Sequence, residues 1–120
     1  MYKVELYETI DGKTPVEDFI DSLDNKMAAK MVGLMEILEE KGPELRLPYS
    51  GPIGDGIFEL RCKLGSDITR ALYFFYSGKK IIITNGFIKK TRKTPTNEIE
   101  LAKKRKNDWI NRYKDENNNK

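Results

Sequence analysis

Four cationic side chains follow directly on an apolar run in the second half of the chain. The stretch IIITNGFIKKTRKTP covers residues 81–95, and its cations are Lys89, Lys90, Arg92 and Lys93. An ammonium or guanidinium group that is held in place at the end of a strand is a favourable partner for phosphate oxygens. The pattern therefore predicts a site for a polyanion where this strand ends.

A second group of charged residues comes from a stretch with strict alternation. In IFELRCKL, residues 57–64, apolar side chains alternate with Glu59, Arg61 and Lys63. A period of two predicts a strand that carries these three residues on one face. Glu59 is open to two interpretations, a cross-strand salt bridge or a carboxylate that accepts a proton.

Arg70 interrupts the next apolar stretch, ITRALYFFY. A buried guanidinium is costly unless it is paired or faces an anion. The hairpin register decides its position. In one register, Gly65 opposes Ile68 across a two-residue turn. Lys63 then opposes Arg70, on the face that also carries Arg61. In the other, a shift of one residue moves Arg70 to the opposite face.

Such a set of cations has the chemistry needed to cleave RNA. The 2′-hydroxyl of RNA is a built-in nucleophile, so a protein has only to align it, stabilise the charged phosphorane and move protons. Arginine and lysine can stabilise the phosphorane, and we expect no metal and no cofactor. The chain has no histidine, so proton transfer is left to Glu59, to Tyr73 or Tyr76, or to a lysine.

The chain has 120 residues, a length typical of a single domain. Its charge is distributed unevenly. Residues 1–50 carry 6 basic and 11 acidic side chains, whereas residues 89–114 carry 10 basic and 3 acidic ones. This asymmetry favours RNA or DNA as the partner of the basic part. The acidic part is either solvated surface or an interface for a second protein, and its side chains include Glu17, Asp18, Asp21, Glu36, Glu39 and Glu40.

Cysteine usage and hydropathy indicate a reducing compartment. Cys62 is the single cysteine, so it cannot form an internal disulfide, and the expected role is that of a small buried side chain. The apolar runs are only a few residues long, which predicts no membrane span, and the first residues lack the apolar block of a signal peptide. We expect the protein in the cytoplasm.

The first part of the chain predicts a strand and two helices. Residues 2–7 alternate as a half-buried strand does. Thr14 is a candidate N-cap of one helix and Asp24 of the next, which ends at Gly42. Residues 42–56 are rich in Gly and Pro, and they are either a functional loop or a missed element.

The remainder predicts strands and a last helix. IFELRCKL, ITRALYFFY and KIIITNGFI form three strands joined by tight turns, an antiparallel meander. Thr94 or Thr96 can cap a helix whose apolar side chains are Ile99, Ala102, Trp109, Ile110 and Tyr113. The order β-α-α-β-β-β-α predicts an α+β fold, an antiparallel sheet with two N-terminal helices on one face and the other face open to solvent. We expect the domain over residues 1–114 and a frayed polar tail over residues 115–120.

The second half of the chain resembles a known family. ELR, the arginine before ALYFFY, GFIKKTRKTP and EIELAKKR occur in the order found in phage-derived HigB-type toxins of the RelE/ParE superfamily, and TPVEDFIDSL in the first half fits as well. The resemblance covers residues 1–112 and implies a RelE/ParE-like fold. It places Arg61, Arg70, Lys89 and Lys90 at the positions of the basic site residues, and it favours the register in which the strand cations share one face.

The resemblance implies the toxin of a type II toxin-antitoxin system, an mRNA interferase. Such a toxin cuts mRNA in the ribosomal A site, leaves a 2′,3′-cyclic phosphate and is held inactive by a HigA-like helix-turn-helix antitoxin. The expected catalytic residues are Arg61, Arg70, Lys89, Lys90 and Glu59. The residues expected to contact RNA are Lys63, Arg92, Lys93 and Tyr73.

The sequence also allows two functions other than RNA cleavage. ParE relatives share the fold but act on gyrase, so the same cations can serve a protein partner without catalysis. A phage-derived nucleic-acid-binding protein without toxicity also needs only the cations. Some HigB toxins use histidines in the site, which this sequence lacks, so the general acid and base stay unassigned.

Overall fold

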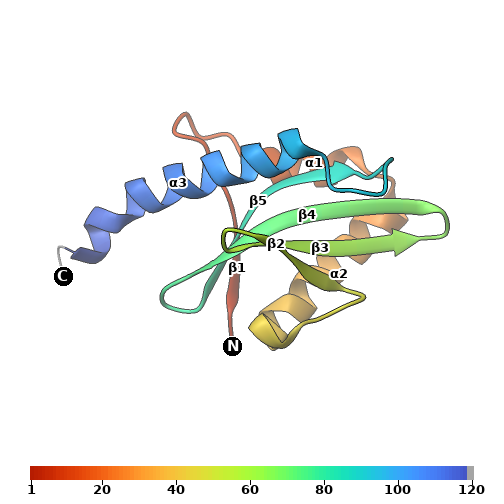
Figure 1. Ribbon diagram of the computed structural model, residues 1–120, viewed down its shortest axis with the longest axis horizontal. Helices are drawn as coiled ribbons and strands as arrows, with labels where there is room; N and C mark the ends of the chain where they lie inside the picture. The colour runs from red at the N-terminus through yellow and green to blue at the C-terminus, as the bar shows by residue number, and fades with distance from the viewer. Residues whose placement is uncertain (119–120) are drawn as a thin grey trace.

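The computed structural model describes residues 1–118 of the chain and the side chains as far as Tyr113. Five strands form one sheet in the order β1-β5-β4-β3-β2 (Figure 1). They are β1 (Lys3–Leu6), β2 (Ser50–Gly54), β3 (Ile57–Leu64), β4 (Asp67–Tyr76) and β5 (Lys80–Ile88). The helices are α1 (Pro15–Ser22), α2 (Asn25–Lys41) and α3 (Thr96–Asn118), with a short 3-10 helix η1 (Gly42–Glu44) after α2. The predicted mixed α+β class is confirmed.

The element order differs from the prediction by one strand. β2 lies within residues 42–56 and pairs antiparallel with β3 at the edge of the sheet, so this stretch contains a missed element. Pro52 offers no backbone N–H, and an edge strand tolerates that loss. β1 runs parallel to β5, so the sheet is antiparallel only from β2 to β5.

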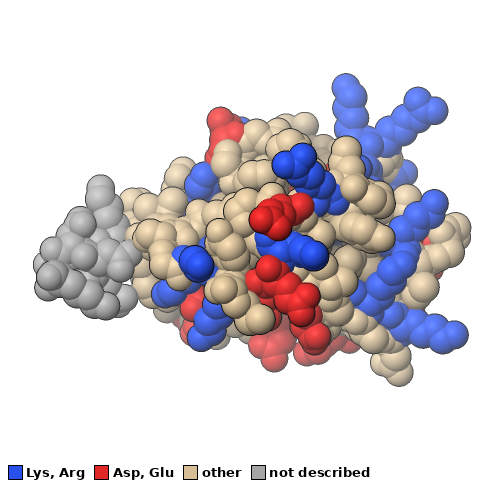
Figure 2. Space-filling model, turned by 90° about the horizontal axis from the view of Figure 1, so that it is seen from below, with Lys and Arg blue, Asp and Glu red and all other residues tan. Residues whose placement is uncertain are grey.

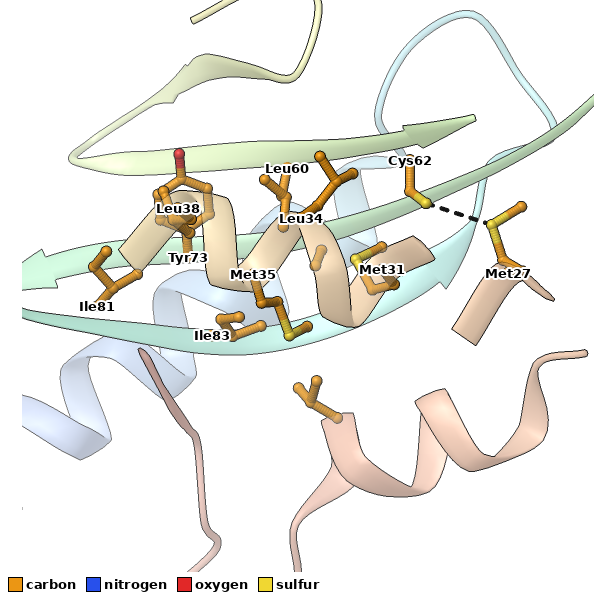
Figure 3. Close-up of a cluster of buried hydrophobic side chains, with 12 residues drawn as sticks. Met27, Met31, Leu34, Met35, Leu38, Leu60, Cys62, Tyr73, Ile81 and Ile83 are labelled. Atoms are coloured by element: carbon orange, nitrogen blue, oxygen red, sulfur yellow. Dashed lines mark hydrogen bonds between the residues drawn. The ribbon is translucent and has the colours of Figure 1, made fainter. Parts of the chain in front are cut away.

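Helices α1 and α2 cover one face of the sheet and bury the larger core (Figure 3). Met27 and other apolar side chains of α2 pack on β3, β4 and β5. Cys62 is fully buried, with its Sγ 3.5 Å from Met27 Sδ, as expected of a small apolar side chain. Asp24 caps α2 as predicted, because its Oδ1 accepts a hydrogen bond from Met27 N at 2.9 Å. Thr14 precedes α1 as predicted but makes no side-chain bond to the helix backbone.

The opposite face of the sheet was predicted to be open to solvent, and this prediction is wrong because α3 covers it (Figure 1). Trp109 packs on Phe74 with ring centroids 5.9 Å apart, and Ala102 is fully buried against Leu72 and Phe87. The reason lies in β4 and β5, whose consecutive apolar residues need cover on both faces. The basic residues of β3 therefore lie beside a helix layer and not on a bare sheet.

Helix α3 begins and ends differently from its prediction. Its first helical hydrogen bond runs from Ile99 N to Pro95 O at 3.2 Å, so Pro95 occupies the N-cap position in place of Thr94 or Thr96. The helix continues to Asn118 and overlaps the tail predicted for residues 115–120, of which residues 119–120 lie outside the described part. Within residues 1–118, no helix combines the length and the apolar content of a membrane span.

Candidate nucleic-acid interface

Arg61 and Arg70 are direct cross-strand partners in the β3–β4 hairpin. Their side chains therefore lie on one face of the sheet, as expected. The register itself differs from both predicted ones, because the two-residue turn begins at Gly65 and Arg70 opposes Arg61 in place of Lys63. Gly65 adopts a φ of 62°, the left-handed conformation that such a hairpin turn requires at its first position.

Glu59 lies between the two arginines. Its Oε2 is 3.2 Å from Arg61 Nε, and its Oε1 is 3.3 Å from Arg70 Nε. Thr94 donates a hydrogen bond from Oγ1 to Glu59 Oε1 at 2.6 Å. Only 1% of Glu59 is exposed, so these three neighbours enclose its carboxylate. Of the two interpretations of Glu59, the geometry favours the salt bridge over proton exchange with a substrate.

The two guanidinium groups differ in their exposure to solvent. The side chain of Arg70 is 9% exposed and that of Arg61 is 37% exposed. Burial lowers the pKa of Arg70, while Glu59 raises it and the neighbouring Arg61 lowers it. The buried Nε of Arg70 lies near Glu59 without the alignment of a hydrogen bond. One carboxylate between two guanidinium groups leaves an excess of positive charge, which a bound anion would offset.

A hollow of about 310 Å³ opens beside these arginines, at the edge of β3 beyond the first residue of β2. Its walls come from α2, from the loop before β2, and from β3 and β4. They consist of Lys30, Leu34, Pro48, Tyr49, Arg61, Lys63, Ile68 and Arg70. Four of these side chains are cationic and none is acidic, so the hollow is suited to an anion.

Sequence reasoning missed two walls of the hollow, Lys30 and Tyr49. Lys30 lies on the exposed side of α2, and its Nζ donates a hydrogen bond to Lys63 O across the edge of the sheet. Tyr49 lies in the stretch rich in Gly and Pro, where no periodicity assigns a direction to a side chain. The one available signal was an aromatic residue in a long loop, since such loops often carry binding residues.

The cations that follow β5 lie at the same end of the molecule. Lys89 N donates a hydrogen bond to Ile68 O at 2.8 Å, so the chain leaves β5 alongside the start of β4. Lys90, Arg92 and Lys93 are exposed. Among the described residues, none of these four cations forms an ion pair. Figure 2 shows Lys and Arg side chains projecting from the end where Figure 1 places the β3–β4 turn and the connection from β5 to α3.

Tyr73 does not belong to this surface, so its predicted contact with RNA is wrong. Its side chain points to the face covered by α2 and is 1% exposed. The hydroxyl forms a buried hydrogen bond with Ser50 Oγ, and burial raises the pKa of Tyr73. Tyr76 lies near the other end of β4, with its ring centroid 4.6 Å from that of Trp109. Neither tyrosine reaches the hollow.

Most of the chain, including these residues, matches one protein family. The sequence matches the family model described as Phage derived protein Gp49-like (DUF891) over residues 18–107, three-quarters of the chain. The chain belongs to this family. The Gp49-like family is toxin-like, and the matched span contains every wall of the hollow as well as the cations after β5. No curated protein matches the sequence.

Proposed function

We propose that this Gp49-like protein is the toxin of a type II toxin-antitoxin system, an endoribonuclease that cleaves mRNA on the ribosome. The observation that supports the proposal most is the pairing of Arg61 with Arg70 at a hollow whose walls include no carboxylate. A phosphodiester bound there offsets the excess positive charge of the pair. Lys89 and Lys90 are then placed to hold neighbouring phosphates.

The proposed reaction needs no nucleophile from the protein. The 2′-oxygen attacks the adjacent phosphorus, the bond to the 5′-oxygen of the next nucleotide breaks, and the products are a 2′,3′-cyclic phosphate and a 5′-hydroxyl. Arg61, the more exposed arginine, donates to the non-bridging oxygens, whose charge grows in the phosphorane. Arg70 supports the same phosphate from the buried side, and Glu59 orients both guanidinium groups.

The proton of the 2′-hydroxyl has to pass to a group that faces the hollow. Glu59 is enclosed by its three neighbours and is a positioning residue in this mechanism. Besides the arginines, the titratable side chains of the walls are Lys30, Tyr49 and Lys63. We assign the acceptor of this proton, and the donor of a proton to the 5′-oxygen, to the two lysines of this set, Lys30 and Lys63.

The proposed partners come from the resemblance to HigB-type toxins. They are a HigA-like helix-turn-helix antitoxin and the ribosome with mRNA in its A site, which would place the protein in the cytoplasm. Figure 2 shows Asp and Glu side chains gathered in the middle of the view, apart from the cationic end. An antitoxin that binds this acidic region would need a second segment of its own to cover the cations.

The test is cleavage of a defined mRNA by the purified protein in the presence of ribosomes. Wild type is expected to cut, with a 2′,3′-cyclic phosphate at the new end. Arg61→Ala should cut on the order of a hundredfold more slowly, since it removes a donor to the phosphorane. Lys41→Ala is the matched control, because Lys41 is the last residue of α2, is exposed and does not line the hollow. An intact message with wild type and with Arg61→Ala alike would refute the proposal.

Expression in cells separates this function from action on gyrase. An mRNA interferase predicts growth arrest with cut messages by primer extension. A gyrase inhibitor predicts growth arrest with DNA damage and intact messages. No arrest in a strain without an antitoxin would favour a binding protein without toxicity.

A further inference from the structure

Half of the hollow is poorly matched to a phosphate group. Leu34, Pro48, Tyr49 and Ile68 contribute apolar or aromatic surface opposite the cations. A site for phosphate alone would need donors on all sides, whereas a site for a nucleotide needs donors for its phosphate and a flat apolar surface for its base. Its volume of about 310 Å³ lies at the lower end of the range of roughly 300–1,000 Å³ for small-molecule sites.

Tyr49 has the geometry of a stacking platform. Its backbone is fixed on both sides, because its N–H donates to Arg46 O at 3.0 Å and its carbonyl accepts from Arg61 N at 2.8 Å. Its side chain is nevertheless accessible to a ligand, since Tyr49 is 52% exposed. Within the described residues, its ring makes no aromatic contact and its hydroxyl no hydrogen bond. An exposed ring on a fixed backbone next to an arginine loses little conformational freedom when it stacks on a ligand.

We propose that the hollow binds a whole nucleotide of the RNA, with its base stacked on Tyr49 and its phosphate on Arg61 and Arg70. Lys30 and Lys63, on either side of the edge of β3, flank the same nucleotide. This inference rests on the proposed function and adds to it a residue that positions the scissile nucleotide. Stacking is tolerant of base identity. Tyr49 therefore determines where the RNA strand is held, and other contacts determine which codon is cut.

The first experiment compares Tyr49→Ala, Tyr49→Phe and wild type in ribosome-dependent cleavage. Tyr49→Ala is expected to lower kcat/KM by roughly tenfold to a hundredfold, the usual loss for one stacked base. Tyr49→Phe keeps the stacking ring and should keep kcat/KM near that of wild type. Equal rates for all three proteins would refute the nucleotide subsite and leave the proposed function standing. No cleavage by wild type would refute the proposed function itself.

The second experiment does not depend on cleavage. Adenosine 3′-monophosphate and ribose 5-phosphate are titrated into each protein, and binding is followed by NMR shifts of the backbone amides around Tyr49 and Arg61. Wild type and Tyr49→Phe are expected to bind the nucleotide at least tenfold more tightly than the sugar phosphate. In Tyr49→Ala this preference should disappear while the sugar phosphate still binds. The same preference in Tyr49→Ala, or none in wild type, would refute stacking on Tyr49.

Discussion

Arg61 and Arg70 face each other across β3 and β4, and the single carboxylate of Glu59 contacts both. Two like charges directly opposite each other destabilise a sheet. The buried carboxylate offsets this repulsion and fixes the direction of each guanidinium. The site is thus held together by one acidic side chain that is itself almost inaccessible to solvent.

Glu59→Gln should lower the free energy of unfolding by about 3 kcal/mol, because it leaves the buried Arg70 beside a second cation without a counter-charge. Urea denaturation at pH 7 measures the change. Glu100→Gln is the control, since Glu100 is 66% exposed and lies 3.8 Å from Lys103, and a surface pair of this kind contributes little to stability. Similar losses for the two variants would contradict the central role of Glu59.

Alkaline pH should destabilise the fold through its buried tyrosines. Burial raises the pKa of Tyr73, and burial together with Asp108 raises the pKa of Tyr7. The unfolded chain ionises its tyrosines near pH ~10, before the folded chain does. The contribution of these two tyrosines to the free energy of unfolding is therefore fully present below about pH 10 and is lost as the pH rises above it. In urea denaturation between pH 8 and 11, Tyr73→Phe should show a smaller fall than wild type, and parallel curves would contradict this.

Gly86→Ala should destabilise the protein by about 1–3 kcal/mol, the usual cost of an overpacked core. A Cβ at Gly86 would lie 2.5 Å from Phe19 Cδ2, where α1 packs on β5. Gly33→Ala is the opposite case, because a Cβ there has no neighbour within 4 Å and alanine in a helix is favoured over glycine by about 0.5–1 kcal/mol. Thermal unfolding compares the two. A stabilising Gly86→Ala would mean that α1 does not pack as described.

Charge reversal after β5 should weaken RNA binding without affecting stability. Lys90→Glu and Lys93→Glu change exposed side chains, and each is expected to reduce the salt dependence of binding by about 0.7 in the log–log slope for single-stranded RNA. Fluorescence anisotropy with a labelled single-stranded RNA, from 50 to 200 mM salt, measures this slope. Lys41→Glu, at the end of α2, should leave the slope unchanged. Slopes that do not differ would exclude this loop from the RNA path.

The strand pattern identified Arg61 and Arg70 as candidate site residues but predicted neither their pairing nor the side chains around them. Alternation in β3 predicted the face shared by Glu59 and Arg61, because strand side chains repeat every two residues. It could not predict that Arg70 directly opposes Arg61, since the register follows from the residue at which the turn begins. The cover provided by α3 was missed although the apolar runs of β4 and β5 implied it.

The hollow depends on tertiary contacts that no local pattern encodes. Tyr49 and Lys30 meet β3 from a loop and from a helix, and neither has a spacing related to the strand. β2 was hidden by its Gly and Pro content, which is permitted only because the strand lies at the edge. The side chains least accessible to sequence reasoning are therefore those that distinguish a nucleotide site from a simple basic patch.

The parallel pairing of β1 with β5 has a consequence for biosynthesis. β1 is made first, but its partner residues Lys80–Ile83 emerge only after most of the chain has been translated. Thr94, which closes over Glu59, emerges later still. While the chain is being made, Arg61 and Arg70 therefore lack part of the structure that surrounds them, and the hollow can be completed only at a late stage of translation or after release. Assembly order alone would delay any action of this protein on the ribosome that makes it.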